Sequence, residues 1–241
     1  MGDAPTIGRV RRALREVAVN EYVATLQSFF KTGPGEYGEG DIFIGVRLPA
    51  ARAVARRFKD LALEEVIELL YSKIHEERLV SLLILVHQFK EGDEAHRERI
   101  LKLYLANTSQ INNWDLVDTS APQIVGAYFL RRPKAELRRL ARSPLVWDRR
   151  IAIVGTFTLI RAGEHDETMR LARVLLHDEH DLIRKAVGWM LREVGKRDEP
   201  RLVEFLERHA HEMPRVMLRY SLERLDAPLR KRFMVVKAKP V

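Results

Sequence analysis

The amino-acid sequence predicts an all-α protein built from paired helices. Apolar residues recur at the three- and four-residue spacing of an amphipathic helix along nearly the whole chain. No alternation of apolar and polar residues lasts long enough to predict a strand. Glycine, proline and short polar stretches separate the helical segments and suit turns. We therefore expect helices joined by short loops and no sheet.

The breaks between the expected helices carry turn residues. The longest is the glycine-rich stretch 31–40, which has no apolar periodicity and reads as a loop. Pro49 suits the first turn of a helix, whereas Pro122 falls inside a helical segment and should kink or locally unwind it. The expected helices span residues 7–19, 21–30, 50–59, 63–71, 76–89, 94–106, 114–130, 134–142, 147–161, 167–176, 182–194, 200–210 and 214–225.

The second helices of successive pairs begin alike, with a basic residue followed by an aliphatic run. Trp114 occupies this position in one pair, Arg150 follows 36 positions later, and Lys185 follows after another 35. A period in the thirties for paired helices is typical of HEAT or armadillo solenoids. An irregular helical bundle is the alternative. The other members of this set are Arg78 and Arg215.

We therefore predict a superhelical solenoid of antiparallel HEAT-like helix pairs with a concave basic groove. The expectation is a single domain over residues 1–241, in which about 1–8 and 230–241 can be flexible ends. In such a solenoid equivalent helices stack side by side, so residues far apart in the sequence converge on one surface.

Composition limits the classes of function. The net charge of +8 and the pI of about 9.8 favour a polyanionic partner. The sequence has no cysteine, which excludes disulfides and thiolate metal sites and fits a reducing cytosol. No stretch approaches the roughly 20 apolar residues of a membrane span. We expect a cytoplasmic protein with no membrane partner.

The stretch 112–118 carries the clearest chemical signal. Trp114 and Asp118 are four residues apart, so on a helix they share a face. An indole beside a carboxylate suits a ligand that is both cationic and sugar-like. The alternative is a plain helix start, with Asn113 as the N-cap and Asp115 in the first turn. That alternative explains Asn113 and Asp115 but leaves Asp118 without a reason.

Cations recur at the starts of the later second helices. Lys185 and Trp189 repeat the four-residue spacing, so a second indole shares a face with a cation. Guanidinium groups and helix N-termini bind phosphates well, and the number of such contacts sets a salt-sensitive affinity for a nucleic-acid backbone. The basic residues concerned are Arg149, Arg150, Arg184 and Lys185.

Four motifs in this order resemble the AlkD family of DNA alkylation-repair glycosylases. They are Asn-Trp-Asp-Leu-Val-Asp at 113–118, Trp-Asp-Arg-Arg-Ile-Ala at 147–152, Lys-Ala-Val-Gly-Trp-Met-Leu-Arg-Glu at 185–193, and Phe-Ile-Gly-Val-Arg-Leu-Pro at 43–49. The resemblance runs from about residue 22 to residue 225. It implies a HEAT-like fold and a glycosylase that excises alkylated purines such as N3-methyladenine and N7-methylguanine while the base stays largely stacked.

By position, the resemblance implies that Asp118 is the catalytic aspartate. It likewise implies that Trp114 and Trp189 face the sugar and that Arg150 grips a phosphate. The expected partner is double-stranded DNA carrying alkylated bases, bound by a monomer without metal or cofactor. One departure is Arg47, where some members carry a smaller polar residue. The expected DNA-binding residues are Arg150, Arg149, Lys185, Arg184, Arg47 and Arg215.

Several other residues have less specific interpretations. Trp147 is expected to pack in the core or at its rim. Tyr37, in a loop that aligns poorly with the family, is a candidate DNA-contacting aromatic. The basic tail at 229–232, with Lys237 and Lys239, suits either DNA contact or a disordered end. The histidines lack the spacing of metal ligands and are expected in solvated turns: His165, His177, His180, His209 and His211.

Three classes of function remain open at this point. The first is a monofunctional glycosylase, since no lysine stands out as a Schiff-base nucleophile. The second is a non-catalytic DNA-binding member of the same fold that favours distorted or branched DNA. The third is a HEAT-type protein scaffold, which would not require Asp118 beside a tryptophan.

Overall fold

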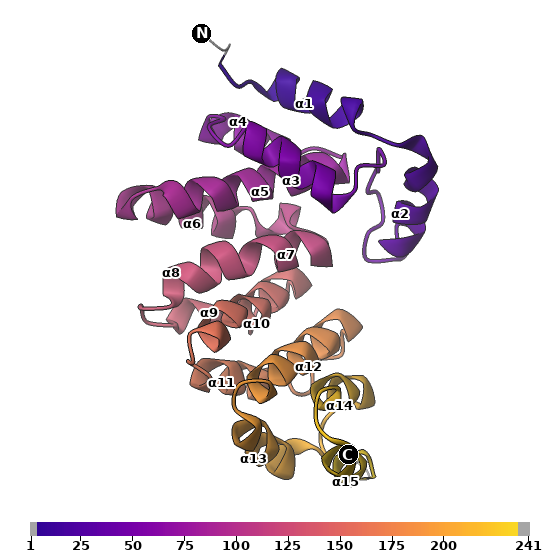
Figure 1. Ribbon diagram of the computed structural model, residues 1–241, viewed down its shortest axis with the longest axis vertical. Coiled ribbons are helices and arrows are strands. Elements are labelled where there is room, and N and C mark those ends of the chain that lie inside the picture. Colours follow the sequence, from indigo (N-terminus) through magenta and orange to yellow (C-terminus); the bar gives the residue numbers. More distant parts are fainter. Residues whose placement is uncertain (1–3, 236–241) are drawn as a thin grey trace. The chain divides into compact units, whose positions relative to one another are not determined.

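The computed structural model describes residues 4–235 and is helical along most of that range (Figure 1). Among these residues the only strand-like pairing is an isolated parallel bridge between Ile42 and Ile74. The all-α prediction is confirmed. The chain divides into two compact units, Met1–Ile124 and Val125–Val241, each with its own core. The single domain expected from the sequence stays a prediction.

The first unit is built around α5 (His75–Glu91), which packs against α3, α4, α6 and α7. Nearly every residue of α5 from His75 to Val86 is buried, as expected for a helix that is covered on all sides. The other elements of this unit are α1 (Ile7–Glu16), η1 (Asn20–Tyr22), α2 (Val23–Phe29), α3 (Leu48–Arg57), α4 (Leu63–Leu70), α6 (Glu94–Ala106), η2 (Thr108–Gln110) and α7 (Trp114–Ala121).

Local capping sets where several of these helices begin. The Thr6 hydroxyl accepts from the Arg9 amide at α1, and Asp93 accepts from the His96 amide at α6. Asn113 is the N-cap of α7, as predicted, and its side-chain oxygen accepts from the Trp114 amide at 2.8 Å. The start of α7, which carries Trp114 and Asp118, is therefore fixed by its own sequence.

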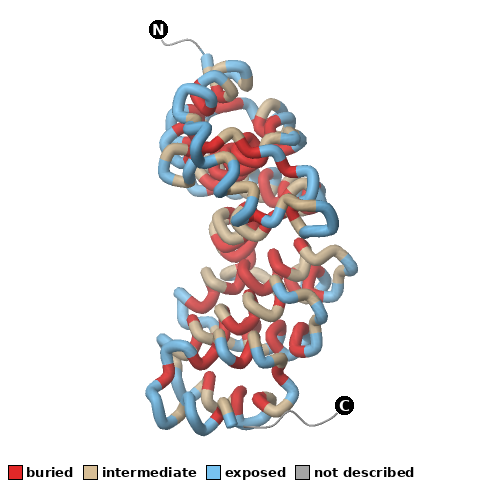
Figure 2. Tube along the Cα trace, turned by 90° about the vertical axis from the view of Figure 1, so that its right-hand side faces the viewer, coloured by how far each residue is buried: buried red, intermediate tan, exposed pale blue. Residues whose placement is uncertain are grey.

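The second unit is organised around α10 (Val146–Arg161) and α12 (Asp181–Gly195), which pack against each other. α12 also packs against α13 and α14, and α10 against α9 and α11. In both units the buried residues lie where helices face one another (Figure 2). The remaining helices are α8 (Ala127–Phe129), α9 (Ala135–Leu140), α11 (Asp166–Val174), α13 (Glu199–His209), α14 (Arg215–Leu222) and α15 (Ala227–Met234).

Pro122 does unwind its helix locally. Residues Pro122–Gly126 form a π-helical turn between α7 and α8, because proline has no amide hydrogen to continue the α-helical ladder. A Cβ on Gly126 would lie 2.1 Å from the Gly155 carbonyl oxygen, so α10 passes very close to this turn. The widened turn and the small residues permit that approach.

The C-terminal basic segment is helical, unlike the disordered end considered from the sequence. Asp226 accepts from the Leu229 amide at 2.8 Å and Pro228 lies in the first turn, so α15 has a well-formed start. Only Phe233 of α15 is buried, which explains why its apolar pattern was not recognised. Residues 1–3 and 236–241, which belong to the ends expected to be flexible, lie outside the described residues. Lys237 and Lys239 are among them.

Within residues 4–235, no helix has both the length and the apolar character needed to cross a membrane.

Gly188 tests the close packing of α12 on α14. A Cβ at Gly188 would lie 2.5 Å from the Met217 carbonyl oxygen and 2.6 Å from the Tyr220 Cβ, and neither atom can move cheaply. Gly188→Ala is expected to lower the free energy of unfolding by about 1–3 kcal/mol in urea titrations. The matched control is Gly8→Ala in α1, where nothing lies within 4 Å and stability should stay equal or rise slightly. Equal stability for the two variants would contradict the packing described.

Candidate functional site

A cavity of about 320 Å³ in the first unit contains the two residues that the sequence singled out most strongly. Trp114 and Asp118 both line it, together with Arg47. Most of its wall is apolar and comes from α2, the segment 43–49 and α5. The lining residues are Leu26, Phe29, Phe30, Phe43, Val46, Arg47, Leu48, Pro49, His75, Glu76, Leu79, Trp114, Asp115, Asp118 and Thr119.

The predicted shared face of Trp114 and Asp118 is present. Both lie on α7, one turn apart, and both are half-buried at the cavity. Leu116 and Val117, between them in sequence, are fully buried and anchor the other side of the helix. The carboxylate is therefore presented at the cavity and not enclosed in the protein interior.

Two phenylalanines hold the indole of Trp114. The ring of Phe30 stacks on it at a centroid distance of 5.1 Å and an interplanar angle of 23°, and Phe29 meets it edge-on at 5.6 Å and 76°. Phe30 is buried, whereas Phe29 is 59% exposed at the mouth of the same cavity. Aromatic pairs of this geometry contribute roughly 0.5–1.5 kcal/mol each, so they fix the orientation of the indole.

Beneath these rings lies a buried cluster of charges that sequence reasoning missed. The His75 ring lies between two carboxylates, with Nδ1 2.9 Å from Asp41 Oδ2 and Nε2 2.8 Å from Asp115 Oδ2. Arg78 donates to the other oxygen of Asp41 at 2.7 Å. His75, Arg78 and Asp41 are almost completely buried. The cluster ties the segment before α3 to the first turns of α5 and α7.

The carboxylates set the charge of His75. Burial alone lowers the pKa of this imidazole, but the ion pair and hydrogen bond with Asp115, and the hydrogen bond with Asp41, outweigh it and raise the pKa to about 9. For Asp41, burial raises the pKa, but the hydrogen bond from His75 and the charge of Arg78 bring it below its usual value. The ring is therefore an imidazolium at neutral pH.

Glu76 shapes another part of the cavity wall. Its buried carboxylate accepts hydrogen bonds from the backbone amides of Ile44, Gly45 and Val46 at 2.9–3.1 Å. These bonds fix the backbone of residues 44–46, so Arg47 has a defined position at the N-cap of α3. The Arg47 guanidinium is exposed and lies 5.3 Å from the Tyr22 ring centroid, a cation–π distance.

The expected phosphate-binding residues of the second unit gather at the starts of α10 and α12. Arg149 forms an ion pair with Asp178 at 2.6 Å, and Arg184 donates to the Asp178 carbonyl. Arg150 is only 5% exposed and donates to the Leu182 carbonyl at 2.7 Å. Arg149 and Arg150 thus have structural partners within this unit.

The other expected residues of this unit are more exposed. Lys185 pairs with Asp181 at 2.5 Å, and Trp189 lies half-buried with its ring 5.9 Å from that of Phe157. Arg215 is exposed on α14 and donates to the Met234 carbonyl at 3.0 Å. Trp189 and Lys185 share a face of α12, as their spacing predicted.

Trp147 and the histidines are further residues for which an expectation followed from the sequence. Trp147 is 5% exposed, so its core assignment is confirmed. Over residues 4–235 no group of three or more histidines, aspartates or glutamates has a metal-binding arrangement. The expectation of solvated histidines holds for His177, which is exposed. It is wrong for the other four, which are half-buried: His165, His180, His209 and His211.

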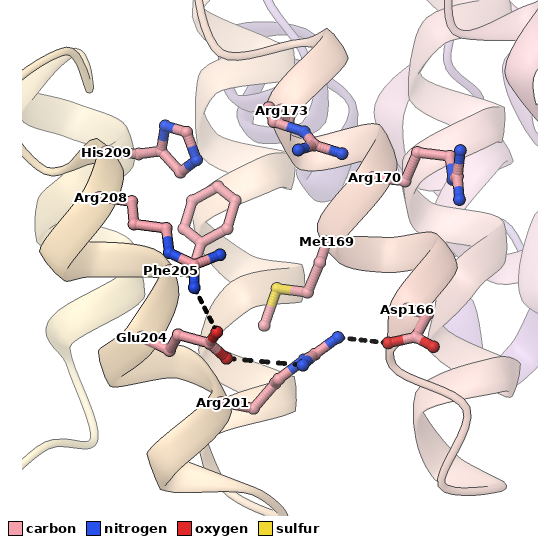
Figure 3. A pocket seen from close by; sticks show the side chains of 9 residues that line it. All are labelled: Asp166, Met169, Arg170, Arg173, Arg201, Glu204, Phe205, Arg208 and His209. Carbon is pink, nitrogen blue, oxygen red and sulfur yellow. Dashed lines mark hydrogen bonds and ion pairs between the residues drawn. The ribbon is translucent and has the colours of Figure 1, made fainter.

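A second cavity, of about 270 Å³, lies between α11 and α13 of the second unit (Figure 3). Arg201 pairs there with Asp166 and Glu204, and Arg208 pairs with Glu204 at 2.7 Å. Two carboxylates face four arginines in this lining, so the cavity keeps an excess of positive charge, and none of the expected site residues lines it. The candidate functional site is the cavity beside Trp114 and Asp118.

The structure is thus that of an all-helical protein that presents an indole and a carboxylate at one mostly apolar cavity. The family model of the DNA alkylation repair enzymes matches residues 10–225. The chain belongs to the DNA alkylation repair enzyme family.

One solved structure extends this comparison. It is described as a predicted DNA alkylation repair enzyme from Enterococcus faecalis, and it matches 86% of this chain and 96% of its own, with a TM-score of 0.66. At 16% sequence identity, this likeness shows that the two proteins share a fold. No curated protein matches the chain.

The raised pKa of His75 makes stability depend on pH. Its contribution is fully present below its ordinary pKa of 6.5 and is lost as pH rises through about 9. Denaturant unfolding across this window is expected to show a loss on the order of 3 kcal/mol. His75→Gln should remove most of that slope, and exposed His177→Gln should keep it. A wild-type stability that does not fall across the window would contradict the charged ring.

Proposed function

We propose that the protein is a DNA glycosylase that hydrolyses the N-glycosidic bond of cationic alkylated purines, such as N3-methyladenine or N7-methylguanine, in duplex DNA. The observation that carries the proposal is that Trp114 and Asp118 line one cavity in a member of the DNA alkylation repair enzyme family. The partner is double-stranded DNA with alkylated bases, and the protein acts as a monomer in base excision repair.

The substrate determines what the site must supply. A purine alkylated at N3 or N7 carries a positive charge, so it leaves the sugar as a neutral base without a general acid. The remaining task is to stabilise the oxocarbenium-like sugar that forms as the bond breaks. A carboxylate beside an aromatic wall meets this requirement.

Asp118 and Trp114 divide that task. The Asp118 carboxylate stabilises the positive charge on the sugar, and it orients or deprotonates the water that attacks the anomeric carbon. The Trp114 indole, held by Phe29 and Phe30, adds a cation–π attraction of ~0.5–2 kcal/mol. Both groups come from one rigid helix, which keeps their spacing constant during the reaction.

The second unit supplies the remaining roles in this proposal. Trp189 acts as the second sugar-facing indole, in keeping with the family pattern. Arg150 holds a phosphate next to the lesion, and the other cations extend the backbone contacts. These cations are Arg149, Arg184, Lys185, Arg215 and, from the first unit, Arg47.

The proposed chemistry is monofunctional, because water and not a lysine is the nucleophile. The products are a free base and an intact abasic strand. A non-catalytic DNA-binding protein of the same fold would bind alkylated duplex but release no base. The base-release assay separates these two functions directly.

Asp118→Asn is expected to lower the single-turnover rate of base release by about 10²–10³-fold, because the charge is removed while the shape is kept. High-performance liquid chromatography of free methylated purine measures this rate. Asp60→Asn is the matched control, since Asp60 is an exposed aspartate that does not line the cavity. Wild-type release by Asp118→Asn would show that this carboxylate is not catalytic.

Arg150→Gln tests the phosphate contact. Glutamine keeps an N–H for the Leu182 carbonyl while it removes the charge, so the fold is least disturbed. The slope of log Kobs for DNA against log salt concentration should become less steep by about 1. The same change at Arg173, an exposed arginine on α11 outside the expected set, should leave the slope unchanged. An unaltered slope for Arg150→Gln would argue against the contact.

A further inference from the structure

The hydrogen-bond geometry of His75 suits a doubly protonated ring. Each ring nitrogen faces a carboxylate oxygen, at 2.9 Å for Asp41 and 2.8 Å for Asp115. An ionised carboxylate only accepts hydrogen bonds, so both nitrogens must donate. Asp41 is kept ionised by Arg78, which donates to its second oxygen. A doubly protonated ring satisfies all of these contacts at once.

The negative charge of Asp115 is balanced by this ring. Its Oδ2 meets His75, whereas its Oδ1 is buried and has no hydrogen-bond partner within the part of the chain that the structure describes. A buried carboxylate with one strong partner is destabilised when that partner loses its charge. His75 therefore decides whether the first turn of α7 can carry Asp115 in its present position.

The surroundings of His75 are otherwise apolar or already paired. Phe43 stacks on the ring at 4.5 Å and 21°, and Phe30 lies against it at 5.1 Å and 33°. The titratable and charged groups around it are Asp41 from the segment before α3, Arg78 from α5 and Asp115 from α7. Neighbouring Glu76 is turned to the backbone amides of residues 44–46. Water screens none of these charges effectively.

The cluster reaches the candidate site through α7. Asp115 follows Trp114 directly, and Asp118 lies three residues further on, so the two carboxylates are neighbours on the helix surface. Two like charges at that spacing repel each other. The imidazolium cancels the charge of Asp115, which leaves Asp118 as the carboxylate that acts on the cavity. His75 also lines that cavity.

We infer that His75 is a positioning residue: its imidazolium ties Asp41 to Asp115 and fixes the first turn of α7, which carries Trp114 and Asp118. This inference rests on the proposed function for its catalytic consequence. The positioning of α7 can be tested without activity.

The first experiment follows His75 itself in the whole protein. Nitrogen-15 NMR of the histidine rings, with His75 assigned by His75→Gln, should show a doubly protonated ring at neutral pH that titrates near pH 9. In protein labelled with fluorotryptophan, the Trp114 resonance should shift with the same midpoint. A neutral ring at pH 7, or a Trp114 signal that ignores the titration, would overturn the inference.

The second experiment measures the single-turnover rate of base release against pH. The wild-type rate should fall as pH passes the His75 midpoint. In Asp115→Asn this fall in rate, the alkaline limb of the profile, should move to lower pH, because the variant lacks the ion pair that raises the His75 pKa most. Asparagine can still donate to a neutral imidazole, so the fold is preserved. The wild type and the variant act on the same substrate, so a shift of the alkaline limb reports a group of the enzyme. An unmoved limb would overturn the inference.

His75→Gln separates positioning from binding. Glutamine cannot supply a charge to both carboxylates, so the rate at saturating protein should fall about 10-fold or more while the Kd for DNA stays close to wild type. His177→Gln, an exposed histidine of the second unit, is the control and should change neither. Equal loss in Kd and rate would indicate general disruption and contradict the positioning role.

The two proposals fail differently. If the wild-type protein releases no base while the NMR midpoints of His75 and Trp114 coincide, the proposed glycosylase is wrong and the positioning of α7 stands. If base is released but the limb of Asp115→Asn coincides with that of the wild type, the glycosylase stands and His75 is only a core residue.

Discussion

The candidate site depends on one buried imidazolium between two carboxylates. The His75 ring joins Asp41, in the segment before α3, to Asp115 in the first turn of α7, and Arg78 balances the remaining charge. Such a cluster is costly to desolvate and is stable only when all partners are present. The cluster therefore holds α7 and the segment before α3 in fixed positions at the cavity. The Glu76 carboxylate, which accepts from the amides of residues 44–46, fixes the rest of that segment.

Local signals made much of the fold predictable. Helical periodicity placed the helices of both units, and the proline at 122 marked the turn that became π-helical. The N-cap at Asn113 and the common face of Trp114 and Asp118 follow from residues within one or two turns of each other. Features of this kind are set by neighbours in the sequence, and no knowledge of tertiary contacts is needed.

The charge cluster could not be predicted because its members meet only in the folded chain. Asp41 and Asp115 lie 34 and 40 positions from His75 in the sequence. Asp115 also satisfied a simpler expectation, that of an acidic residue in a first helical turn. Arg78 and Arg150 belong to the repeated basic position at helix starts, and the sequence does not show that both are buried and donate to backbone carbonyls. α15 was not predicted from the sequence because Phe233 is its only buried residue, so the helix has little apolar periodicity.

The proposed reaction depends on the charge of the leaving base, since the site offers a carboxylate and an aromatic wall but needs no acid. The most direct measurement compares base release from two matched duplexes, one with N7-methylguanine and one with the uncharged lesion O6-methylguanine. The protein is expected to release the cationic base well above its spontaneous loss and to release none of the neutral base. Equal release of both bases, or of neither, would contradict this expectation.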